Sequence, residues 1–518
     1  MTDAAVARSL TLAVVLRHDA AYYAGKPALR LDGAEITYAA LAHAVEARMR
    51  ELGAHIAAGD RVALWFHNSF GWLTAFLALN ALGAVSVPIN TRLTASELGV
   101  ILRDVEARAL ITVRHYRKRD YLDEALSVLD TLDQATIVFD ASADLDGPWP
   151  VTLPSRGGVP RASAVADDLL CIQYTSGTTA LPKGVMLTNR AYVQTAAYVA
   201  RCQRLTPSSR FISGAPFFHC SGTMHAITTS LLAGCTLTGM SAWDPERFCD
   251  ETARYQCDVS HMVYYRDVLA LGSPTARRRV ASMRVTHDLG TPDYLARIHD
   301  ELGIAGVSNL YGMTETCGQF TMWFPDDPLD KRLAANGRPQ PGNRVRIADA
   351  NGAALPPGQF GEIQMQGPTV TRGYFNRPDA SAAAFTSDGW LRSGDLGTLT
   401  PDGELVYAAR EKEIIRVGGE NLAPAEVEQV LRDACNVQQV CVVGVPDARL
   451  DEVPAAVIVG TSVTDWTGVL ATLRTRLAGF KVPRSIYTAA ELPMTATNRV
   501  QRAVLREWIA SGKLTRVA

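Results

Sequence analysis

The chain has 518 residues, of which 47% are hydrophobic and 20% are charged. At roughly 100 to 200 residues per domain, this length predicts about three or four domains or subdomains. Lys and Arg total 51 and Asp and Glu total 53, so the net charge of −2 gives no indication of a nucleic acid, an anionic membrane or a polycationic partner. With 40 glycines and 26 prolines, the composition matches a globular protein with many turns and excludes collagen-like, disordered and polytopic membrane classes.

Cysteine usage and the N-terminus favour a cytoplasmic protein. The 9 cysteines are scattered singly, with no Cys-x-x-Cys pair, which is typical of reduced thiols. Only a short apolar run separates Arg8 from Arg17, which makes a poor signal peptide. Residues 71–89 are uncharged, but Asn80, Gly83 and Pro88 interrupt them, so we expect a buried helix over 72–82 and a buried strand over 84–88, with no membrane span.

Helical and strand patterns alternate through the first part of the chain. Residues 38–52 predict an amphipathic helix and 61–66 a strand, and 95–103 and 109–113 continue the alternation. A second stretch, 211–307, repeats this style, with 231–238 and 259–264 as candidate buried strands. Such alternation is typical of parallel α/β units.

The pattern changes twice towards the C-terminus. Between 337 and 407, short strands at 343–347, 361–365 and 404–407 are divided by Gly, Pro, Asn and Asp turns, which predicts an antiparallel, β-barrel-like subdomain. Beyond residue 410, we expect a helix over 424–434, strands over 439–445 and 455–459, and a helix over 467–477. The predicted fold class is therefore α/β, with a large N-terminal domain over 1–411 and a small α+β domain over 412–518.

The densest motif is Tyr174-Thr-Ser-Gly-Thr-Thr-Ala-Leu-Pro-Lys-Gly-Val185, which follows the apolar segment 169–173. Small residues allow backbone N–H groups to turn towards one anion, hydroxyl groups add donors, and Lys183 adds a positive charge. The motif predicts a phosphate-binding loop, although it lacks the Walker pattern. Its candidate ligands are Thr175, Ser176, Gly177, Thr178, Thr179 and Lys183.

At this point the chain closely resembles the adenylate-forming superfamily, which includes acyl-CoA and aryl-CoA ligases, luciferases and the adenylation domains of peptide synthetases. The resemblance covers nearly the whole chain, because further motifs follow the phosphate loop in the family's order. They are Pro216-Phe-Phe-His219 with Gly222, Gly290-Thr-Pro292, Tyr311-Gly-Met-Thr-Glu315, Gly389-Trp-Leu-Arg-Ser-Gly-Asp395, Arg410-Glu-Lys412, Gly418-Gly-Glu-Asn421 with Pro424-Ala-Glu426, Phe480-Lys-Val-Pro483 and the run from Pro493 to Arg502.

The resemblance implies that a carboxylic acid is activated through AMP. Glu315 is expected to hold Mg²⁺, a hard cation that takes carboxylate oxygens while bridging phosphates. Tyr311 offers an aromatic face to adenine, and Asp395 can accept hydrogen bonds from the ribose hydroxyls. The other candidate nucleotide ligands are Gly290, Thr291, Pro292, Gly312, Thr314 and Arg410.

The resemblance also implies a gate, a hinge and a tunnel for CoA. His219 is expected to stand between the acyl pocket, lined by Phe217, Phe218 and Gly222, and the thiol entrance; a buried core histidine is the alternative. Lys412 falls at the family's hinge, where the small domain rotates between adenylation and thioester formation, although its charge also suits a solvated surface. After rotation, the pantetheine tunnel would be lined by Gly418, Gly419 and Glu420. The aromatic and small residues favour a hydrophobic, ring-containing acid.

Three positions depart from the family pattern. Where the family has Gly-Lys in Pro-x-Thr-x-x-Gly-Lys-x-x-Arg, this chain has Asn498 and Arg499, and Ala180 replaces the second glycine of the phosphate loop. The resemblance places all three where the phosphates of ATP would be handled, and a planar guanidinium is not equivalent to a compact ammonium. Loss of one well-placed transition-state donor costs on the order of 10²- to 10³-fold in rate.

We therefore hypothesise that the protein accepts a preformed acyl-adenylate, supplied by a separate adenylating enzyme, and catalyses its thioesterification with CoA. The Ala- and Arg-rich composition would suit an enzyme of bacterial secondary metabolism. Three alternatives stay open. Arg499 can support adenylation, which would make the protein a complete ATP-dependent ligase. The protein can be a non-catalytic relative that binds acyl-adenylate. A carrier protein acting in trans can replace CoA, because a phosphopantetheine arm enters in the same way.

Overall fold

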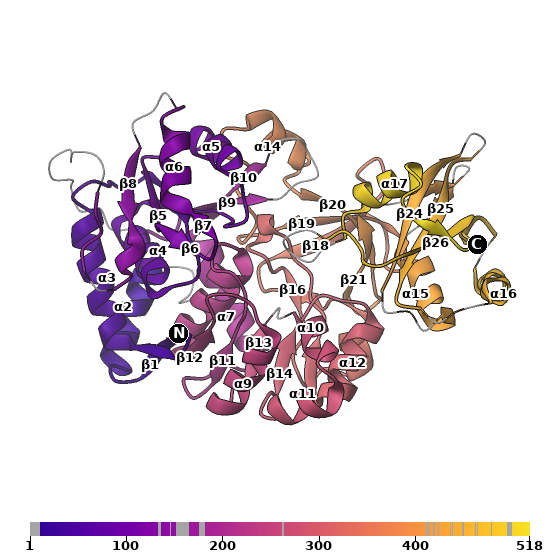
Figure 1. Cartoon of the computed structure of the whole chain (residues 1–518), viewed down its shortest axis with the longest axis horizontal. Coiled ribbons are helices and arrows are strands. Elements are labelled where there is room, and N and C mark those ends of the chain that lie inside the picture. Colours follow the sequence, from indigo (N-terminus) through magenta and orange to yellow (C-terminus); the bar gives the residue numbers. More distant parts are fainter. Residues whose placement is uncertain are drawn as a thin grey trace. The chain divides into compact units, whose positions relative to one another are not determined.

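The computed structural model describes residues 11–132, 136–145, 147–151, 165–175, 182–261, 264–410, 413, 415–417, 420–422, 424–435, 437, 439–447, 450–461, 463, 465–477, 479–494 and 500–518. Its contacts divide the chain into two compact units. The first contains Met1–Val345, Met365–Arg392 and Pro401–Val406, and the second contains Arg346–Gln364, Ser393–Thr400 and Tyr407–Ala518. Figure 1 labels many of the elements of both units.

A mainly parallel sheet of the first unit has the strand order β10-β9-β4-β3-β5-β8. The strands from β9 to β8 pair in parallel, and β10 pairs antiparallel with β9. This arrangement confirms the parallel α/β units predicted from the alternating pattern. The strands are β3 (Arg61–Trp65), β4 (Val85–Pro88), β5 (Ala109–Thr112), β8 (Ile137–Asp140), β9 (Leu169–Thr175) and β10 (Lys183–Thr188).

Side-chain caps define the helices that alternate with these strands. The Thr37 hydroxyl accepts a hydrogen bond from the Ala40 amide at 3.2 Å where α3 begins, and the Ser69 hydroxyl caps α4 in the same way. Gly83, with φ 73°, ends α4 in the left-handed conformation. These helices are α2 (Leu12–Tyr22), α3 (Tyr38–Leu52), α4 (Phe70–Leu82), α5 (Ala95–Asp104) and α6 (Tyr121–Leu129).

The uncharged stretch 71–89 forms α4 and β4, as predicted. Nearly every residue of α4 is buried, including Trp72 and Phe76, whose ring centroids lie 5.3 Å apart. The burial of α4 within the core therefore explains why this helix has no polar face. Among the described residues, no helix combines the length and the apolar character needed to cross a membrane.

A second parallel sheet of the first unit has the order β15-β14-β13-β11-β12-β1-β2, in which only the β1–β2 pair is antiparallel. Because parallel strands end at one edge, the segments that follow β13, β14 and β15 leave the sheet on the same side. The strands are β1 (Pro27–Leu31), β2 (Ala34–Thr37), β11 (Arg210–Ile212), β12 (Thr236–Gly239), β13 (Val259–His261), β14 (Val285–His287) and β15 (Gly306–Ser308).

The strand predicted over 231–238 is wrong in its first half. The chain forms α8 (Thr229–Ala233), and Gly234, with φ 63°, ends that helix before β12 begins at Thr236. A short apolar run fits a buried helix and a buried strand equally well, so periodicity could not decide between them. The other helices here are α7 (Asn189–Cys202), a π-helix (Ser221–Thr228), α9 (Pro245–Tyr255), α10 (Tyr265–Ala270), α11 (Ser273–Arg279), α12 (Pro292–Leu302), α13 (Leu329–Ala334) and α14 (Pro378–Ala384).

The β region predicted after residue 337 is present as short strands. β16 (Thr321–Met322) pairs antiparallel with β17 (Arg338–Pro339). A further sheet has the linear order β18-β19-β20-β21. Its strands are β18 (Arg344–Ala348), β19 (Gly361–Gln366), β20 (Leu391–Leu399) and β21 (Leu405–Arg410).

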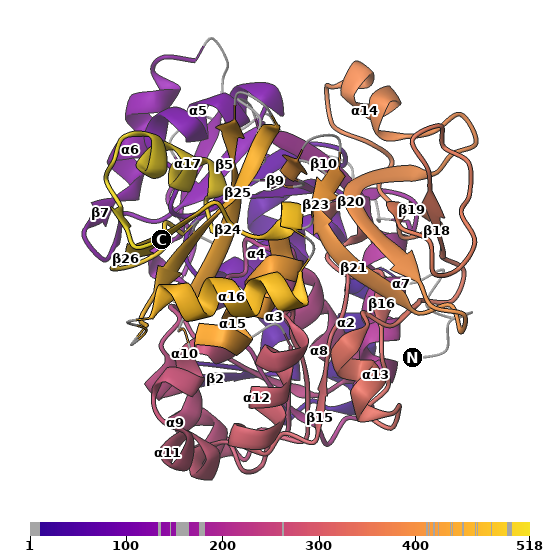
Figure 2. The ribbon, with the colours of Figure 1, turned by 90° about the vertical axis from the view of Figure 1, so that its right-hand side faces the viewer.

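The second unit contains a sheet in the order β23-β22-β25-β26-β27, with β24 also paired to β25. Alternate residues of β24 point to opposite faces: Val440 and Val442 pack with residues of α15 and α16, whereas Cys441 and Val443 pack with Leu505 of α17. Figure 2 shows α15 and α16 beside these strands. The elements are β22 (Ile415–Val417), β23 (Glu420–Leu422), α15 (Pro424–Cys435), β24 (Gln439–Asp447), β25 (Asp451–Val459), α16 (Trp466–Arg476), β26 (Ser485–Ala489), α17 (Arg502–Ala510) and β27 (Thr515–Arg516).

The predicted fold class is confirmed: a large N-terminal part built on α/β sheets is followed by a smaller α+β part. All nine cysteines are buried and unpaired, as expected for core thiols. The domain boundary and hinge at Lys412 stay a prediction, because Lys412 lies outside the described residues.

Candidate nucleotide and thioester site

The two ends of the predicted phosphate loop face each other across a β-hairpin. Thr175 is the last residue of β9, Lys183 is the first of β10, and the two are cross-strand partners. Ser176, Gly177, Thr178, Thr179 and Ala180 lie between them and outside the described residues. The hairpin therefore fixes the position from which the lysine side chain projects.

Tyr374 connects two of the predicted site residues. Its hydroxyl donates a hydrogen bond to Glu315 Oε1 at 2.9 Å, and Lys183 Nζ lies 4.9 Å from its ring centroid. Burial, and then the nearby Glu315 carboxylate, raise the pKa of the Tyr374 hydroxyl, so it remains a donor at neutral pH. The structure thus brings the predicted metal ligand and the predicted phosphate-loop lysine to one tyrosine.

Glu315 fits the role of a magnesium ligand that also needs substrate oxygens. Its side chain is only 6% exposed, and its backbone carbonyl accepts a hydrogen bond from the Thr371 amide at 2.7 Å. Within the described ranges, no cluster of three or more His, Cys, Asp or Glu side chains could hold a metal by itself. Mg²⁺ is commonly held by one or two carboxylates together with phosphates and water, so a single buried carboxylate suits it.

The segment around Glu315 is shaped by close backbone packing. Tyr311 is buried and forms a bridge with Thr321, and Gly312 packs so closely that a Cβ atom there would lie 2.5 Å from the Gly318 carbonyl oxygen. Thr314 begins a short 3₁₀ helix that carries Glu315. Only glycine fits at position 312, which explains one glycine of the Tyr-Gly-Met-Thr-Glu motif. The expected contact between Tyr311 and adenine stays a prediction.

The Gly290-Thr291-Pro292 motif forms the turn between β14 and α12. Thr291 is the N-cap of α12, its hydroxyl accepts from the Tyr294 amide at 3.4 Å, and Pro292 is the first helical residue. The Gly290 carbonyl accepts a hydrogen bond from Asn309, which follows β15, at 2.9 Å. The turn is therefore attached to the adjacent strand end.

His219 precedes a π-helix and is half-buried. Its Nδ1 accepts a hydrogen bond from the Ser221 amide at 3.2 Å and lies 2.8 Å from the Ser221 hydroxyl oxygen. Because a backbone amide can only donate, the neutral ring carries its proton on Nε2. His219 can therefore donate from Nε2, while its accepting nitrogen is already engaged.

The predicted acyl-pocket residues have different surroundings. Phe217 is 1% exposed, and its ring centroid lies 5.6 Å from that of Trp72 in the core. Phe218 is half-buried, and its carbonyl accepts from the Gln173 side chain at 2.8 Å. A Cβ atom on Gly222 would lie 2.2 Å from the Pro216 carbonyl oxygen, so this glycine permits close approach of the π-helix to the preceding segment. Their part in acid binding stays a prediction.

The remaining predicted residues belong to the second unit. Asp395 lies on β20, is 3% exposed, and its amide donates to the Ser393 hydroxyl at 3.0 Å. Arg410 ends β21 and Glu420 begins β23. The predicted residues of this unit that lie outside the described part of the chain are Lys412, Gly418, Gly419, Asn498 and Arg499.

Arg502, the last residue of the final motif, forms a charged network within the second unit. Its guanidinium donates to Glu428 at 2.9 Å, to Glu413 at 3.3 Å and to the Val442 carbonyl. Burial alone would lower the pKa of Arg502, but Glu428, Cys441 and Glu413 together outweigh it and raise that pKa. The arginine is thus an anchor for the residue directly after the predicted hinge lysine.

Sequence reasoning missed Tyr374, Asp288 and Tyr294. Tyr374 lies 59 positions from its partner Glu315, and only the fold brings them together. A weak signal existed for the other pair, because Asp288 lies two residues before the Gly-Thr-Pro motif and Tyr294 lies two residues after it. That signal would not have been specific without the contact between the two side chains.

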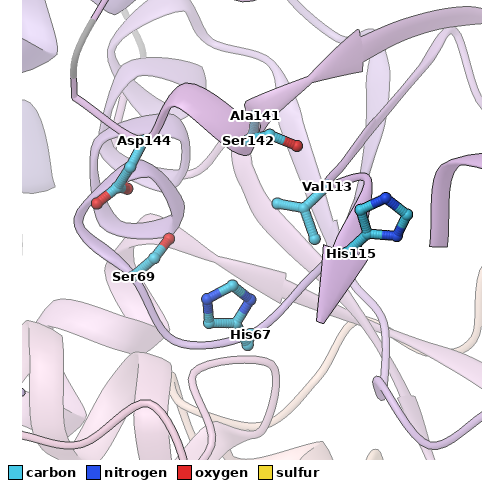
Figure 3. Close-up of a pocket in the computed structure, with 7 residues that line it drawn as sticks. All are labelled: His67, Ser69, Val113, His115, Ala141, Ser142 and Asp144. Carbon is cyan, nitrogen blue, oxygen red and sulfur yellow. The ribbon is translucent and has the colours of Figure 1, made fainter. Parts of the chain in front are cut away.

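A small cavity of about 150 Å³ lies outside the predicted site residues. It opens where β3, β5 and β8 end, a position at which the strand order reverses between β3 and β5 and where ligands often bind in α/β sheets. Figure 3 shows the labelled side chains around it. The lining residues are His67, Ser69, Val113, His115, Ala141, Ser142 and Asp144.

Family models match most of the chain. The model described as AMP-binding enzyme matches residues 16–375, and the model described as AMP-binding enzyme C-terminal domain matches residues 426–499. The chain belongs to the AMP-binding enzyme family. The resemblance inferred from the motifs is thereby confirmed at the level of the superfamily.

Two relatives and one solved structure illustrate the likeness. The 3-[(3aS,4S,7aS)-7a-methyl-1,5-dioxo-octahydro-1H-inden-4-yl]propanoyl:CoA ligase of Mycobacterium tuberculosis is 36% identical, with 86% of this chain and 89% of the relative covered. Feruloyl-CoA synthase of Amycolatopsis sp is 34% identical over 92% of this chain and 95% of its own. O-Succinylbenzoate coenzyme A synthetase of Bacillus subtilis, solved with ATP and a magnesium ion, has a TM-score of 0.80 and 28% identity, covering 95% and 99% of the two chains.

Proposed function

We propose that this AMP-binding enzyme forms an acyl-CoA thioester from a hydrophobic, ring-containing carboxylic acid through an acyl-AMP, and that it mainly catalyses the second half-reaction. In that step the CoA thiolate attacks the acyl carbon, a thioester bond forms, the bond to the AMP phosphate oxygen breaks, and AMP leaves. A separate enzyme would supply the acyl-adenylate.

The location of the three departures carries the proposal. Ala180, Asn498 and Arg499 stand where the family resemblance places contacts to the phosphates of ATP, whereas Glu315, Tyr311 and Asp395 keep the family's residue types for AMP and magnesium. An arginine in place of a lysine changes both the size and the preferred partners of the cation. Loss of one well-placed charge contact costs on the order of 10²- to 10³-fold, and that loss would fall on adenylation.

Other residues have roles that their contacts support. Glu315, together with substrate oxygens, would hold Mg²⁺, which when bound offsets negative charge on the phosphate. Tyr374 keeps the Glu315 carboxylate oriented through its hydrogen bond. With Nδ1 accepting from the Ser221 amide, the neutral His219 ring carries its proton on Nε2, a tautomer that does not suit removal of the thiol proton.

A complete two-step ligase is the competing proposal, and two observations favour it. The C-terminal family match extends to residue 499 and so includes Asn498 and Arg499, and the Bacillus subtilis neighbour was solved with ATP and magnesium. The two proposals differ only in whether the protein makes its own acyl-adenylate.

Pyrophosphate exchange separates the two proposals. Pure protein with Mg²⁺, ATP and a panel that includes ferulate, o-succinylbenzoate and acetate should give little exchange, whereas synthetic feruloyl-AMP or o-succinylbenzoyl-AMP with CoA should give rapid thioester formation. Robust exchange with any acid would contradict the half-reaction proposal and support the complete ligase. If AMP binds but acyl-AMP and CoA give no thioester, a non-catalytic binder is favoured; turnover with a carrier-bound pantetheine thiol in place of CoA would indicate a carrier partner.

Restoring the family residues provides the matched gain-of-function control. Asn498→Gly combined with Arg499→Lys, with and without Ala180→Gly, should raise pyrophosphate exchange by at least tenfold while leaving the thioesterification rate within a factor of about two. No gain in a correctly folded variant would contradict the assignment of these positions to ATP.

A further inference from the structure

Asp288 is a buried carboxyl next to the turn predicted to bind nucleotide. It directly follows β14 and is 8% exposed. One carboxyl oxygen accepts a hydrogen bond from the Leu289 amide at 2.8 Å, and the other accepts from the Tyr294 hydroxyl at 2.7 Å. Both oxygens therefore bind groups within the same turn and the helix that follows it.

The Tyr294 ring occupies the space that a side chain at position 290 would need. A Cβ atom on Gly290 would lie 2.1 Å from Tyr294 Cδ1, far inside any normal carbon contact. On the other side, Asn309 donates a hydrogen bond to the Gly290 carbonyl at 2.9 Å. The turn is thus held between the tyrosine ring and the Asn309 amide, and the Asp288 carboxyl fixes the far end of that ring.

We propose that Asp288 and Tyr294 are positioning residues for adenine nucleotide binding, which set the backbone of the 290–292 turn without touching the ligand. The inference rests on the proposed function, because it takes this turn to contact AMP. It adds a reason for the glycine in the motif: the residue at position 290 must accommodate the Tyr294 ring, and the ring must be held by Asp288.

The groups around Asp288 are a mixture of neutral donors and one cation. Burial raises the pKa of its carboxyl to about 7, while the Tyr294 hydroxyl, the Leu289 amide and the Arg266 guanidinium act in the opposite direction. Arg266 stacks on Tyr294, with its guanidinium carbon 4.3 Å from the ring centroid, and the Tyr264 hydroxyl is a further titratable group nearby. An asparagine at position 288 can accept from Leu289 and donate to the tyrosine oxygen, so it preserves the contacts without the charge.

Calorimetric titration of the full-length protein with AMP, and separately with CoA, tests this proposal. Tyr294→Phe and Asp288→Ala should each weaken AMP binding about tenfold, since each removes a buried hydrogen bond that holds the turn, and should change CoA affinity less than twofold. Asp288→Asn should keep wild-type AMP affinity. Tyr38→Phe, which removes another buried tyrosine hydroxyl bound to the Cys235 carbonyl at 2.7 Å, is the matched control and should leave AMP affinity unchanged.

A double-mutant cycle between positions 290 and 294 gives an independent readout if Tyr294→Phe or Asp288→Ala unfolds. Gly290→Ala should weaken AMP binding strongly in the presence of Tyr294 but only slightly in a Tyr294→Ala background, because the new methyl group then has room. Wild-type protein that does not bind AMP would overturn the proposed function together with this inference. If wild-type protein binds AMP, three results would overturn the inference alone. The first is an AMP affinity of Tyr294→Phe and Asp288→Ala within twofold of wild type, and the second is an equal loss of affinity in Asp288→Asn and Asp288→Ala. The third is an additive effect of the changes at positions 290 and 294.

Discussion

Three buried carboxylates, two in the first unit and one in the second, are held by different kinds of donor. In the first unit, Asp288 and Glu315 accept hydrogen bonds from the tyrosine hydroxyls of Tyr294 and Tyr374. In the second unit, Glu428 is bound by the guanidinium of Arg502. A neutral hydroxyl orients a carboxylate without cancelling its charge, whereas a guanidinium does both.

This difference separates carboxylates that can respond to a ligand from one that supports the fold. A carboxylate that a neutral hydroxyl orients keeps its charge and can attract a cation. Burial raises the pKa of the Asp288 carboxyl to about 7, so this group can also take up a proton. A carboxylate that is already paired with an arginine gains little further stabilisation from a bound cation or a proton. The predicted magnesium ligand Glu315 and the proposed positioning residue Asp288 are both bound by a tyrosine, and the following changes test this comparison with Glu428.

Removal of the arginine should have the largest effect. Arg502→Ala leaves Glu428 and Glu413 buried or half-buried without their cation, so it should lower the free energy of unfolding of the second unit by about 3 to 5 kcal/mol. Urea unfolding followed by tryptophan fluorescence measures this. Arg502→Met combined with Glu428→Met should recover much of the loss; a single variant within about 1 kcal/mol of wild type would mean that the pair is not structural.

Asp288→Asn should change the pH dependence of stability. The carboxyl pKa is raised in the folded state from 3.8 to about 7, so the stability it contributes is present at low pH and is lost as pH rises towards and through 7. Between pH 5 and pH 8, wild type should therefore lose about 2 to 3 kcal/mol relative to the variant, at about 1.4 kcal/mol for each pH unit below the folded pKa. Urea unfolding at both pH values measures it.

The control for this pH effect is Asp293→Asn, which changes an exposed carboxyl on α12, the helix that follows Asp288. Its stability should track that of wild type at both pH values. If the Asp288 and Asp293 variants behave alike, burial is not the cause of the shift, and the first unit would not hold a responsive carboxylate at position 288.

Tyr374→Phe removes the neutral donor from Glu315 while keeping the ring near Lys183. Partners of metal-binding residues typically contribute 10- to 100-fold to metal affinity or activity, so the Mg²⁺ concentration needed for half-maximal thioester formation should rise by about that factor. Tyr121→Phe, which removes a hydroxyl bound to the Thr91 carbonyl at 2.7 Å, should not change the Mg²⁺ dependence. An unchanged dependence in Tyr374→Phe would separate Glu315 from the metal.

Ser221→Ala should have the smallest effect. It removes the hydroxyl 2.8 Å from His219 Nδ1 but leaves the Ser221 amide bond that fixes the tautomer. We expect a two- to tenfold lower rate of thioester formation, since one hydrogen bond is worth about 0.5 to 1.5 kcal/mol. A loss beyond 100-fold would indicate that the hydroxyl itself takes part in the chemistry.

Local patterns predicted most elements because buried positions are hydrophobic and recur along the sequence with the period of the helix or strand. The helix over 38–52 coincides with α3, and the uncharged run 71–89 divides into α4 and β4 as expected. The error at 231–238 arose where a short apolar run has no polar face to reveal its period, and a left-handed Gly234 decides where the helix stops. Sequence likewise supplied the motif residues but not their partners.

By itself, the sequence determined the fold class and the superfamily, because composition, periodicity and ordered motifs are local properties of the chain. It also predicted the candidate nucleotide and metal residues. Only the tertiary structure decided which groups hold those residues in place. Tyr374 reaches Glu315 from 59 positions away, and Arg502 reaches Glu428 from 74 positions away. Whether a buried carboxylate is compensated depends on such long-range contacts, and no local pattern records them.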